Sequence, residues 1–404
     1  MLKRINSQSK IGLVILTFVA FISLGMPDGL LGIAWPSIRS SFSIPIDSLG
    51  MLLLFTVAGY LTSSFLSGSL ISHWGIGRVL ALSCAITGMG LIGYTLVPAW
   101  WMMVLLGTFA GLGAGAIDAG LNTYVAANFG EGLMQWLHAS YGIGITLGPL
   151  IMTLALTEFN SWRVGYRFVG SFQVLLAICF VFTLAMWSRD SSTATSNEPK
   201  LLTDYKTPLM NSLKQLPVWL SVLLFFIYVG TEVSLGIWTY SILTESRGIN
   251  ATTAGFFAGS YWATFTIGRV IAGLYAKRIG INLLVQGSLI IALLGALLLV
   301  WNPVGWVNLM AVALIGFAIA PIFPALMSGT SRRVQPVHAA NTIGLQIAAS
   351  GLGTALIPGT LGVLARQLSL EALPLCFVGA FIILFGLFRL TMYTNFGTLS
   401  IMRD

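Results

Sequence analysis

Three carboxylates stand inside long apolar stretches of the sequence, and they are the residues best placed to do chemistry. Of the twelve acidic residues, Asp28, Asp118 and Glu232 are the ones that we place deep in apolar segments. A carboxylate at the centre of a bilayer costs about 2.5–3.5 kcal/mol on insertion scales, so it must be paired, protonated or facing water. A group in that position can bind and release a proton, and we predict proton coupling for all three. The alternative is a structural carboxylate that neighbouring hydroxyl or backbone groups cap.

The segments around two of these acids are rich in small residues. Asp118 lies in GLGAGAIDAGLN, residues 111–122, and Asp28 lies in SLGMPDGLLGIAW, residues 23–35. Small residues let helices approach closely in lipid, where no hydrophobic force drives one helix onto another. Pro27 weakens the helical hydrogen-bond ladder beside Asp28 and permits bending. We expect tightly packed helices that turn their acids toward an interior cavity.

A second set of residues could contact a polar solute. Aromatic faces stack against the C–H faces of sugars, and side-chain amides hydrogen-bond to hydroxyl groups. We predict that substrate binding involves two tryptophans, one tyrosine and two amides: Trp35, Trp238, Tyr141, Asn122 and Gln346. The alternative for the aromatic residues is that they anchor helices at the membrane interface. The histidines and cysteines have no spacing typical of a metal site, so we expect no bound metal.

One basic residue, Arg269, also lies within an apolar segment. Its long side chain can extend to the membrane surface. The alternative is that it is a buried partner of an acid. We also predict a gating role for Arg269.

Composition indicates the class of protein that carries these residues. Of the 404 residues, 56% are hydrophobic and only 8% are charged, whereas a soluble protein has roughly 25% charged residues. This composition is typical of a polytopic membrane protein. Basic loops on the cytoplasmic side account for the net charge of +8, so we expect a lipid bilayer and no nucleic acid as a partner. The sequence has no P-loop, Ser–His–Asp or HExxH arrangement, which argues against ATP-driven transport and against an enzyme.

About twelve apolar stretches are long enough to span a bilayer. They cover residues 11–35, 49–71, 79–97, 101–126, 134–158, 166–187, 216–243, 251–275, 282–301, 304–327, 338–364 and 372–393. A polar stretch at 188–215 divides them six and six and has the composition of a linker. We therefore predict an all-α integral membrane protein with pseudo-symmetric six-helix bundles at 1–187 and 216–404. The linker could carry a short helix near 204–213, and the basic residues put both termini in the cytoplasm.

The two halves share features at a nearly constant offset. The matching positions are Asp28 with Glu232, Gly68 with Gly273, and His138 with His338, at offsets of 204, 205 and 200 residues. Two like halves around a site near the midplane are the architecture of many secondary transporters, which are driven by ion gradients.

The chain resembles the major facilitator superfamily, which has two six-helix halves. The family's signature loop between helices 2 and 3 is matched in part by GSLISHWGIGR, residues 68–78, and its second copy by residues 273–280. Ser72 and His73 stand where the family usually has Asp and Arg. The resemblance implies gating roles for residues of the two loops: Gly68, Arg78 and Arg278.

Within that superfamily the chain is similar to the fucose–proton symporter group. The similarity is carried by Asp28 in helix 1, by GAIDAGLN around Asp118, by LHASYGIGITLGPL at 137–150 and by YVGTEVSLGIW at 228–238. It implies that Asp28 and Asp118 mediate proton coupling and sugar binding. We expect a monomeric transporter in a bacterial inner membrane that takes up a sugar or similar polar solute by alternating access, with the proton gradient as its energy source and no cofactor. The alternative on the same fold is a proton-driven antiporter that exports drugs or metabolites.

Overall fold

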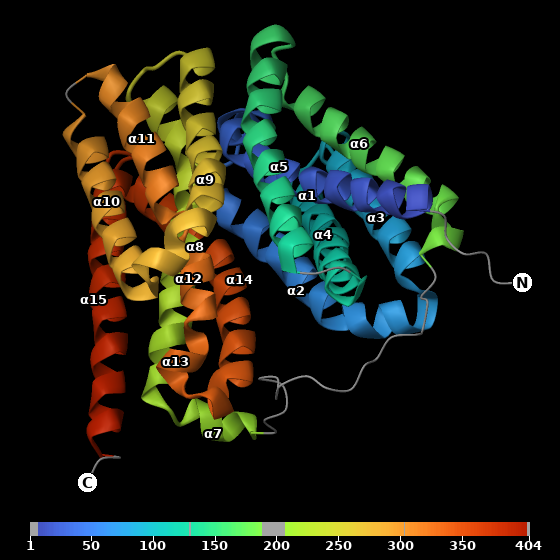
Figure 1. The fold of residues 1–404 in the computed structure, drawn as a ribbon. Coiled ribbons are helices and arrows are strands. Elements are labelled where there is room, and N and C mark those ends of the chain that lie inside the picture. The colour runs from blue at the N-terminus through green and yellow to red at the C-terminus, as the bar shows by residue number, and fades with distance from the viewer. Residues whose placement is uncertain (1–6, 129–130, 188–206, 303, 402–404) are drawn as a thin grey trace, which may run out of the picture. The chain divides into compact units, whose positions relative to one another are not determined.

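The computed structural model describes residues 7–128, 131–187, 207–302 and 304–401, and every regular element in these ranges is a helix (Figure 1). Contacts between residues divide the chain into two compact units. Unit 1 contains the described residues within Met1–Ser191 and Gly236–Thr266, and unit 2 contains those within Ser192–Leu235 and Ile267–Asp404.

Unit 1 holds the first six long helices. They are α1 (Ser7–Phe42), α2 (Leu49–Trp74), α3 (Ile76–Tyr94), α4 (Trp100–Asn128), α5 (Glu131–Glu158) and α6 (Trp162–Phe182). Short 3-10 turns at Ile46–Ser48 and Leu184–Met186 precede α2 and follow α6. The unit also takes in the end of α8 (Leu216–Ser241), a π-helical turn at Ile242–Ser246 and the first part of α9 (Ala251–Ile279).

Unit 2 holds the rest of α8 and α9 together with the remaining helices. These are α7 (Leu209–Leu213), α10 (Ile281–Trp301), α11 (Gly305–Ile319), α12 (Ile322–Ser328), α13 (Thr330–Val334), α14 (Pro336–Gln367) and α15 (Ala372–Ile401). Within the stretch 204–213, where the linker could carry a short helix, α7 covers Leu209–Leu213, and residues 204–206 lie outside the described residues. Residues 188–206 of the predicted linker lie outside the described residues, and the bundle bounds at 1–187 and 216–404 stay a prediction.

Eleven helices in the described part of the chain are long and apolar enough to cross a bilayer. Together with the uniformly helical structure, this confirms the predicted all-α membrane fold. The remaining predicted segment, 251–275, is also helical and forms most of α9, but it is not among the eleven. Its sequence contains Arg269 and several Thr, Ser and Gly residues, which lower its mean hydropathy.

One predicted span, residues 304–327, consists of two helices, because the helical hydrogen-bond pattern is interrupted between Ile319 and Ile322 while the backbone angles of Ala320 and Pro321 stay helical. Pro321 and Pro324 have no N–H group to donate, so carbonyl groups one turn earlier lose their helical partners. The Tyr228 hydroxyl donates a hydrogen bond of 2.9 Å to the Ile319 carbonyl oxygen. Backbone groups at membrane depth need a partner from protein or water. Tyr228 supplies one for the Ile319 carbonyl, which lies between the Phe317 and Ala320 carbonyls that the prolines leave without a helical N–H.

Helices α1 and α5 cross with their backbones in contact. A Cβ atom on Gly25 would lie 2.4 Å from the Tyr141 carbonyl oxygen, and one on Gly144 would lie 1.9 Å from the Ile22 carbonyl oxygen. No real Cβ atom fits at such distances, so this crossing requires glycine on both helices. Small residues at the interface bring helices close enough for van der Waals attraction to hold them together in lipid.

Helices α2 and α4 cross in the same way. A Cβ atom on Gly111 would lie 1.9 Å from the Thr56 carbonyl oxygen, and one on Gly115 would lie 2.2 Å from the Tyr60 carbonyl oxygen. The glycine-rich stretch around Asp118 therefore packs α4 tightly against α2, as its composition predicted.

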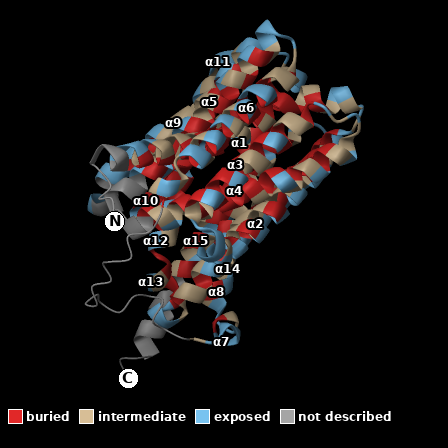
Figure 2. Ribbon diagram, turned by 90° about the vertical axis from the view of Figure 1, so that its right-hand side faces the viewer, coloured by how far each residue is buried: buried red, intermediate tan, exposed pale blue. Residues whose placement is uncertain are grey.

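The outer surfaces of the helices are largely apolar. Buried, intermediate and exposed residues alternate along the helices (Figure 2). Phe65, Phe182 and Leu274 are 89%, 84% and 78% exposed. A soluble monomer rarely exposes so much apolar surface, whereas a bilayer surrounds such side chains with hydrocarbon.

Candidate functional site

The first acid of unit 1 is paired with a tyrosine from another helix. Asp28 lies in the second half of α1, and the Tyr141 hydroxyl of α5 donates a hydrogen bond of 2.6 Å to Asp28 Oδ2. Asp28 is exposed. The backbone contact of Gly25 with Tyr141 brings the tyrosine to this position. An accessible carboxylate with one fixed donor can exchange a proton and can also accept hydrogen bonds from a solute.

The second acid is paired in a similar way. The Tyr60 hydroxyl of α2 donates a hydrogen bond to Asp118 Oδ2, while Asn122 Nδ2 donates to Asp118 Oδ1 at 2.9 Å. Asn122 Nδ2 also donates to the Asp118 carbonyl oxygen at 3.0 Å. Asp118 is half-buried, and each of its two carboxylate oxygens accepts a hydrogen bond from one of these donors.

The two pairs follow the same design. In each case a glycine lies three residues before the acid, Gly25 before Asp28 and Gly115 before Asp118. Each of these glycines touches the backbone carbonyl of the tyrosine whose hydroxyl reaches the acid. The recurring Gly-x-x-Asp pattern was visible in the sequence, but the partner Tyr60 was not identified because only helix packing brings α2 to α4.

The Asp28–Tyr141 and Asp118–Tyr60 pairs interact with each other electrostatically. The charge of Asp118 acts on Asp28, and both carboxylates act on Tyr60. His138 of α5 also acts electrostatically on Asp118. Interactions between charges are strong where protein and lipid exclude water. Unit 1 thus gathers two carboxylates and a histidine from α1, α4 and α5.

The third acid lies in unit 2. Glu232 of α8 is half-buried, with the Tyr228 hydroxyl in hydrogen-bonding reach and Arg269 of α9 close enough to act on its charge. Tyr228 is the residue that also donates to the Ile319 carbonyl at the interruption between α11 and α12. Arg269 thus acts electrostatically on an acid, and its gating role stays a prediction.

The five predicted substrate-binding residues divide into two groups. Tyr141 and Asn122 lie at the acids. The other three are fully buried, each 0% exposed: Trp35, Trp238 and Gln346. A solute contact by these three requires a change of conformation.

The surroundings of two of the buried residues are well defined. Trp35 packs against Trp100 with ring centroids 5.7 Å apart. Gln346 donates 2.6 Å and 3.1 Å hydrogen bonds to the hydroxyls of Ser221 and Thr330. Gln346 therefore belongs to a closed polar network within unit 2, and its role in substrate binding stays a prediction.

Three of the predicted gating residues are exposed at helix ends. Arg78 lies near the start of α3, Arg278 lies near the end of α9, and Gly68 lies toward the end of α2 with no atom within 4 Å of a Cβ built on it. Their gating roles stay predictions.

An ion pair in unit 1 was not predicted from the sequence. Arg39 near the end of α1 donates to Glu245 in the π-helical turn after α8. The two residues are 206 positions apart, and no local pattern connects them. Their contact is one of several that hold residues 236–266 within unit 1.

Close backbone contacts accompany this ion pair. A Cβ atom on Gly32 of α1 would lie 2.5 Å from the Gly236 carbonyl oxygen of α8. Thr266 Oγ1 of α9 donates 2.9 Å to the Gly142 carbonyl oxygen of α5 and lies 3.3 Å from Thr146 Oγ1. Residues 236–266, from the second half of the sequence, are therefore in contact with α1 and α5 within unit 1.

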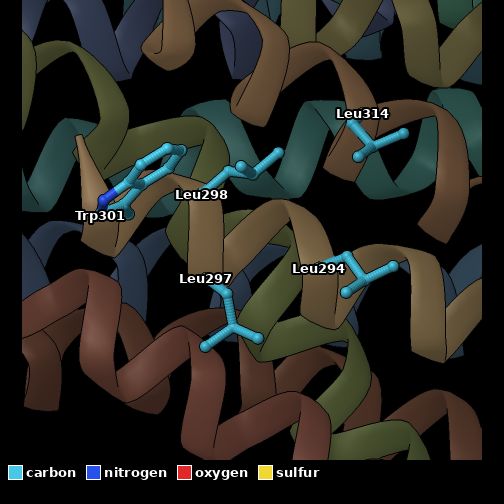
Figure 3. Close-up of a pocket in the computed structure, with 5 residues that line it drawn as sticks. All are labelled: Leu294, Leu297, Leu298, Trp301 and Leu314. Carbon is cyan, nitrogen blue, oxygen red and sulfur yellow. The ribbon is translucent and has the colours of Figure 1, made fainter. Parts of the chain in front are cut away.

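Unit 2 also has a surface pocket, and its lining is apolar, unlike the polar surroundings of the acids. It has a volume of about 430 Å³ and lies at α10 and α11, lined by four leucines and one tryptophan (Figure 3): Leu294, Leu297, Leu298, Leu314 and Trp301. Leucine side chains offer no hydrogen bonds to a polar solute. The pocket suits an acyl chain rather than a sugar.

Some known proteins are similar to this chain in sequence, and some solved structures are similar to it in fold. The chain is similar to the glucose/mannose transporter GlcP of Bacillus subtilis, with 24% identity over 361 residues, 87% of each chain. It is also similar to sodium-dependent glucose transporter 1 of Homo sapiens, with 24% identity over 386 residues, 85% of this chain and 72% of the relative. Among solved structures, the nucleoside transporter NupG has a TM-score of 0.76 at 15% identity, covering 95% of this chain and 99% of that chain.

A family model supports the same assignment. The model described as the Major Facilitator Superfamily matches residues 13–358, which is most of the chain. The helical fold, the membrane-length spans and the transporter relatives agree with it. The chain therefore belongs to the Major Facilitator Superfamily and is an integral membrane transporter of small molecules rather than an enzyme.

Proposed function

We propose that the chain imports a sugar or similar small polar solute together with protons, by alternating access. The observation that carries this proposal is the pair of acid–tyrosine contacts in unit 1, Asp28 with Tyr141 and Asp118 with Tyr60. A carboxylate with a purely structural role needs only hydrogen bonds from neighbouring hydroxyl or backbone groups. Two acids within electrostatic reach of each other, one of them exposed, are better suited to taking up and releasing protons.

The tyrosine hydroxyl gives a physical route to coupling. When Asp28 is ionised, its carboxylate accepts the hydrogen bond from Tyr141. When Asp28 is protonated, its own O–H becomes a donor, and the Tyr141 hydroxyl can donate to a solute hydroxyl instead. Proton binding and solute binding then alter the same hydrogen bond, so that each favours the other.

A sugar is the solute class that these groups favour. Carboxylate, phenol and the Asn122 amide together present donors and acceptors for hydroxyl groups. The relatives named for glucose and mannose transport support this choice. The fucose–proton symporter group is the subgroup that we propose within the family, and the proposal includes a monomer in a bacterial inner membrane with both termini in the cytoplasm.

Alternating access would require the contacts of residues 236–266 with α1 and α5 to open and close. We assign this role to the Arg39–Glu245 ion pair and to the Thr146–Thr266 contact. Each is polar and formed between few atoms, so it can be exchanged for water without loss of a hydrophobic core.

The proposal is tested by uptake of radiolabelled glucose into proteoliposomes that contain the purified full-length chain. Three gradients are imposed separately: protons inward, sodium inward, and none. The variants are Asp28→Asn and Asp118→Asn, with Glu158→Gln as the matched control, because Glu158 is an exposed acid at the end of α5.

The proposal expects accumulation only with the proton gradient, its loss in both Asn variants and its retention in Glu158→Gln. Accumulation driven by sodium alone would overturn proton coupling while leaving sugar transport in place. Equal accumulation by the Asn variants and the unaltered chain would remove the two acids from the mechanism.

A further inference from the structure

A second cavity lies in unit 2, where the first turn of α10 meets α13 and α15. Its volume is about 470 Å³, and its lining includes Asn282, Arg332, Arg333 and Phe388. The helices that line it are α9, α10, α13 and α15, and their sequences contain no Asp or Glu. The cavity therefore has basic walls with no acidic residue in any of the helices that form it.

Arg333 in this cavity is a buried cation that forms no ion pair in the described part of the chain. It is only 7% exposed. Its Nη2 donates to the Leu326 carbonyl oxygen and, at 3.3 Å, to Thr330 Oγ1. Its Nε is buried and has no hydrogen-bond partner in the described part of the chain. Burial lowers the pKa of Arg333 to about 10, because a desolvated guanidinium is costly to keep charged.

The first turn of α10 adds neutral donors to the same cavity. Its N-cap residue, Gly280, has φ +84° and provides no side-chain cap. The first N–H groups of a helix have no partner within the helix, and the helix dipole makes that end favourable for anions. Ile281 and Asn282 of this turn line the cavity together with Arg333.

We propose that this cavity binds the phosphate group of an anionic phospholipid. A phosphate oxygen can accept from the Arg333 guanidinium and from the first-turn amides of α10, and its charge balances the buried cation. The cavity is bordered by apolar side chains, including Leu283, which is 64% exposed, and Ile279, which is 43% exposed. Acyl chains can lie along this border.

The location of the cavity also favours a lipid. Basic residues gather here at the ends of membrane-spanning helices, which marks the cytoplasmic side. Basic pockets between helices on that side are suited to anionic headgroups. A free phosphate ion would use the same N–H groups but would gain nothing from the apolar border.

The test uses the purified full-length chain in a neutral detergent. Binding of phosphatidylglycerol is measured by native mass spectrometry and by the rise in thermal unfolding midpoint, with phosphatidylcholine and inorganic phosphate in parallel arms. The variants are Arg333→Gln, Arg333→Lys and Arg332→Gln. The control is Arg366→Gln, which removes the same charge from an exposed position at the end of α14.

The proposal expects phosphatidylglycerol to bind and stabilise the unaltered chain, and phosphatidylcholine and inorganic phosphate to do neither. Arg333→Gln should weaken phosphatidylglycerol binding about ten- to hundredfold, as loss of a charged hydrogen bond does, and Arg366→Gln should leave it unchanged. If Arg333→Gln does not fold, weaker binding in Arg333→Lys and Arg332→Gln supports the proposal. Unchanged binding in all the folded cavity variants, or equal stabilisation by inorganic phosphate, would overturn it.

Discussion

A methyl group added at the crossing of α1 and α5 should push the two helices apart. In Gly144→Ala the new Cβ atom would lie 1.9 Å from the Ile22 carbonyl oxygen. A carbon and an oxygen atom touch at roughly 3.3 Å, so the two backbones must separate by about 1.4 Å. The Tyr141–Asp28 hydrogen bond spans 2.6 Å. A shift of that size would lengthen it beyond the limit of a hydrogen bond.

Both stability and transport should suffer from this one methyl group. Overpacking costs about 1–3 kcal/mol, and alanine offsets part of it because it favours a helix over glycine by about 0.5–1 kcal/mol. The net loss is therefore about 0–2.5 kcal/mol, which for a chain of 404 residues lowers the unfolding midpoint by up to about 3 °C. Proton-driven glucose uptake should fall because Asp28 loses its donor.

Thermal unfolding followed by tryptophan fluorescence, and uptake in proteoliposomes, would measure the two effects. Gly12→Ala is the matched control on α1, where no atom lies within 4 Å of the built Cβ. It should leave transport intact. A Gly144→Ala protein as stable and as active as the control would refute the close crossing and its role in placing Tyr141.

Three other predictions follow from the contacts in the two units. In the same proteoliposome assay, Tyr141→Phe and Tyr60→Phe should each slow proton-driven uptake about tenfold, because each variant loses a hydrogen bond to a charged group. Full activity in both variants would exclude the tyrosines from coupling. Arg39→Glu and Glu245→Arg should each change the uptake rate, and the combined swap should restore it; a swap no better than either single variant would argue against the ion pair. Tyr228→Phe should lower the unfolding midpoint, because an unsatisfied carbonyl costs about 1–3 kcal/mol; an unchanged midpoint would show that another group satisfies Ile319.

The sequence predicted the fold well because membrane spans depend on local composition. Apolar length alone located the long helices, and the exceptions have physical causes. Arg269 and the neighbouring small polar residues make the mean hydropathy of α9 lower than that of the other spans. Pro321 and Pro324 interrupt a stretch that hydropathy alone treats as one helix.

The candidate site was only partly visible in the sequence, because its partners are set by packing. Asp28 and Asp118 could be identified, since a carboxylate in an apolar segment is costly and therefore conspicuous. Tyr60 and Glu245 could not, because each meets its partner across 58 and 206 residues of chain. Burial of Trp35 was equally unpredictable, since an indole can line a cavity or fill a core.

The central claim is that protons move with the solute through Asp28 and Asp118. The most direct measurement is the lumen pH of proteoliposomes that contain a pH-sensitive dye, recorded after glucose is added outside with no gradient imposed. The account predicts that the lumen becomes more acidic with the unaltered chain and does not change with Asp28→Asn or Asp118→Asn. Entry of glucose with no change of lumen pH, or equal acidification by all three proteins, would contradict it.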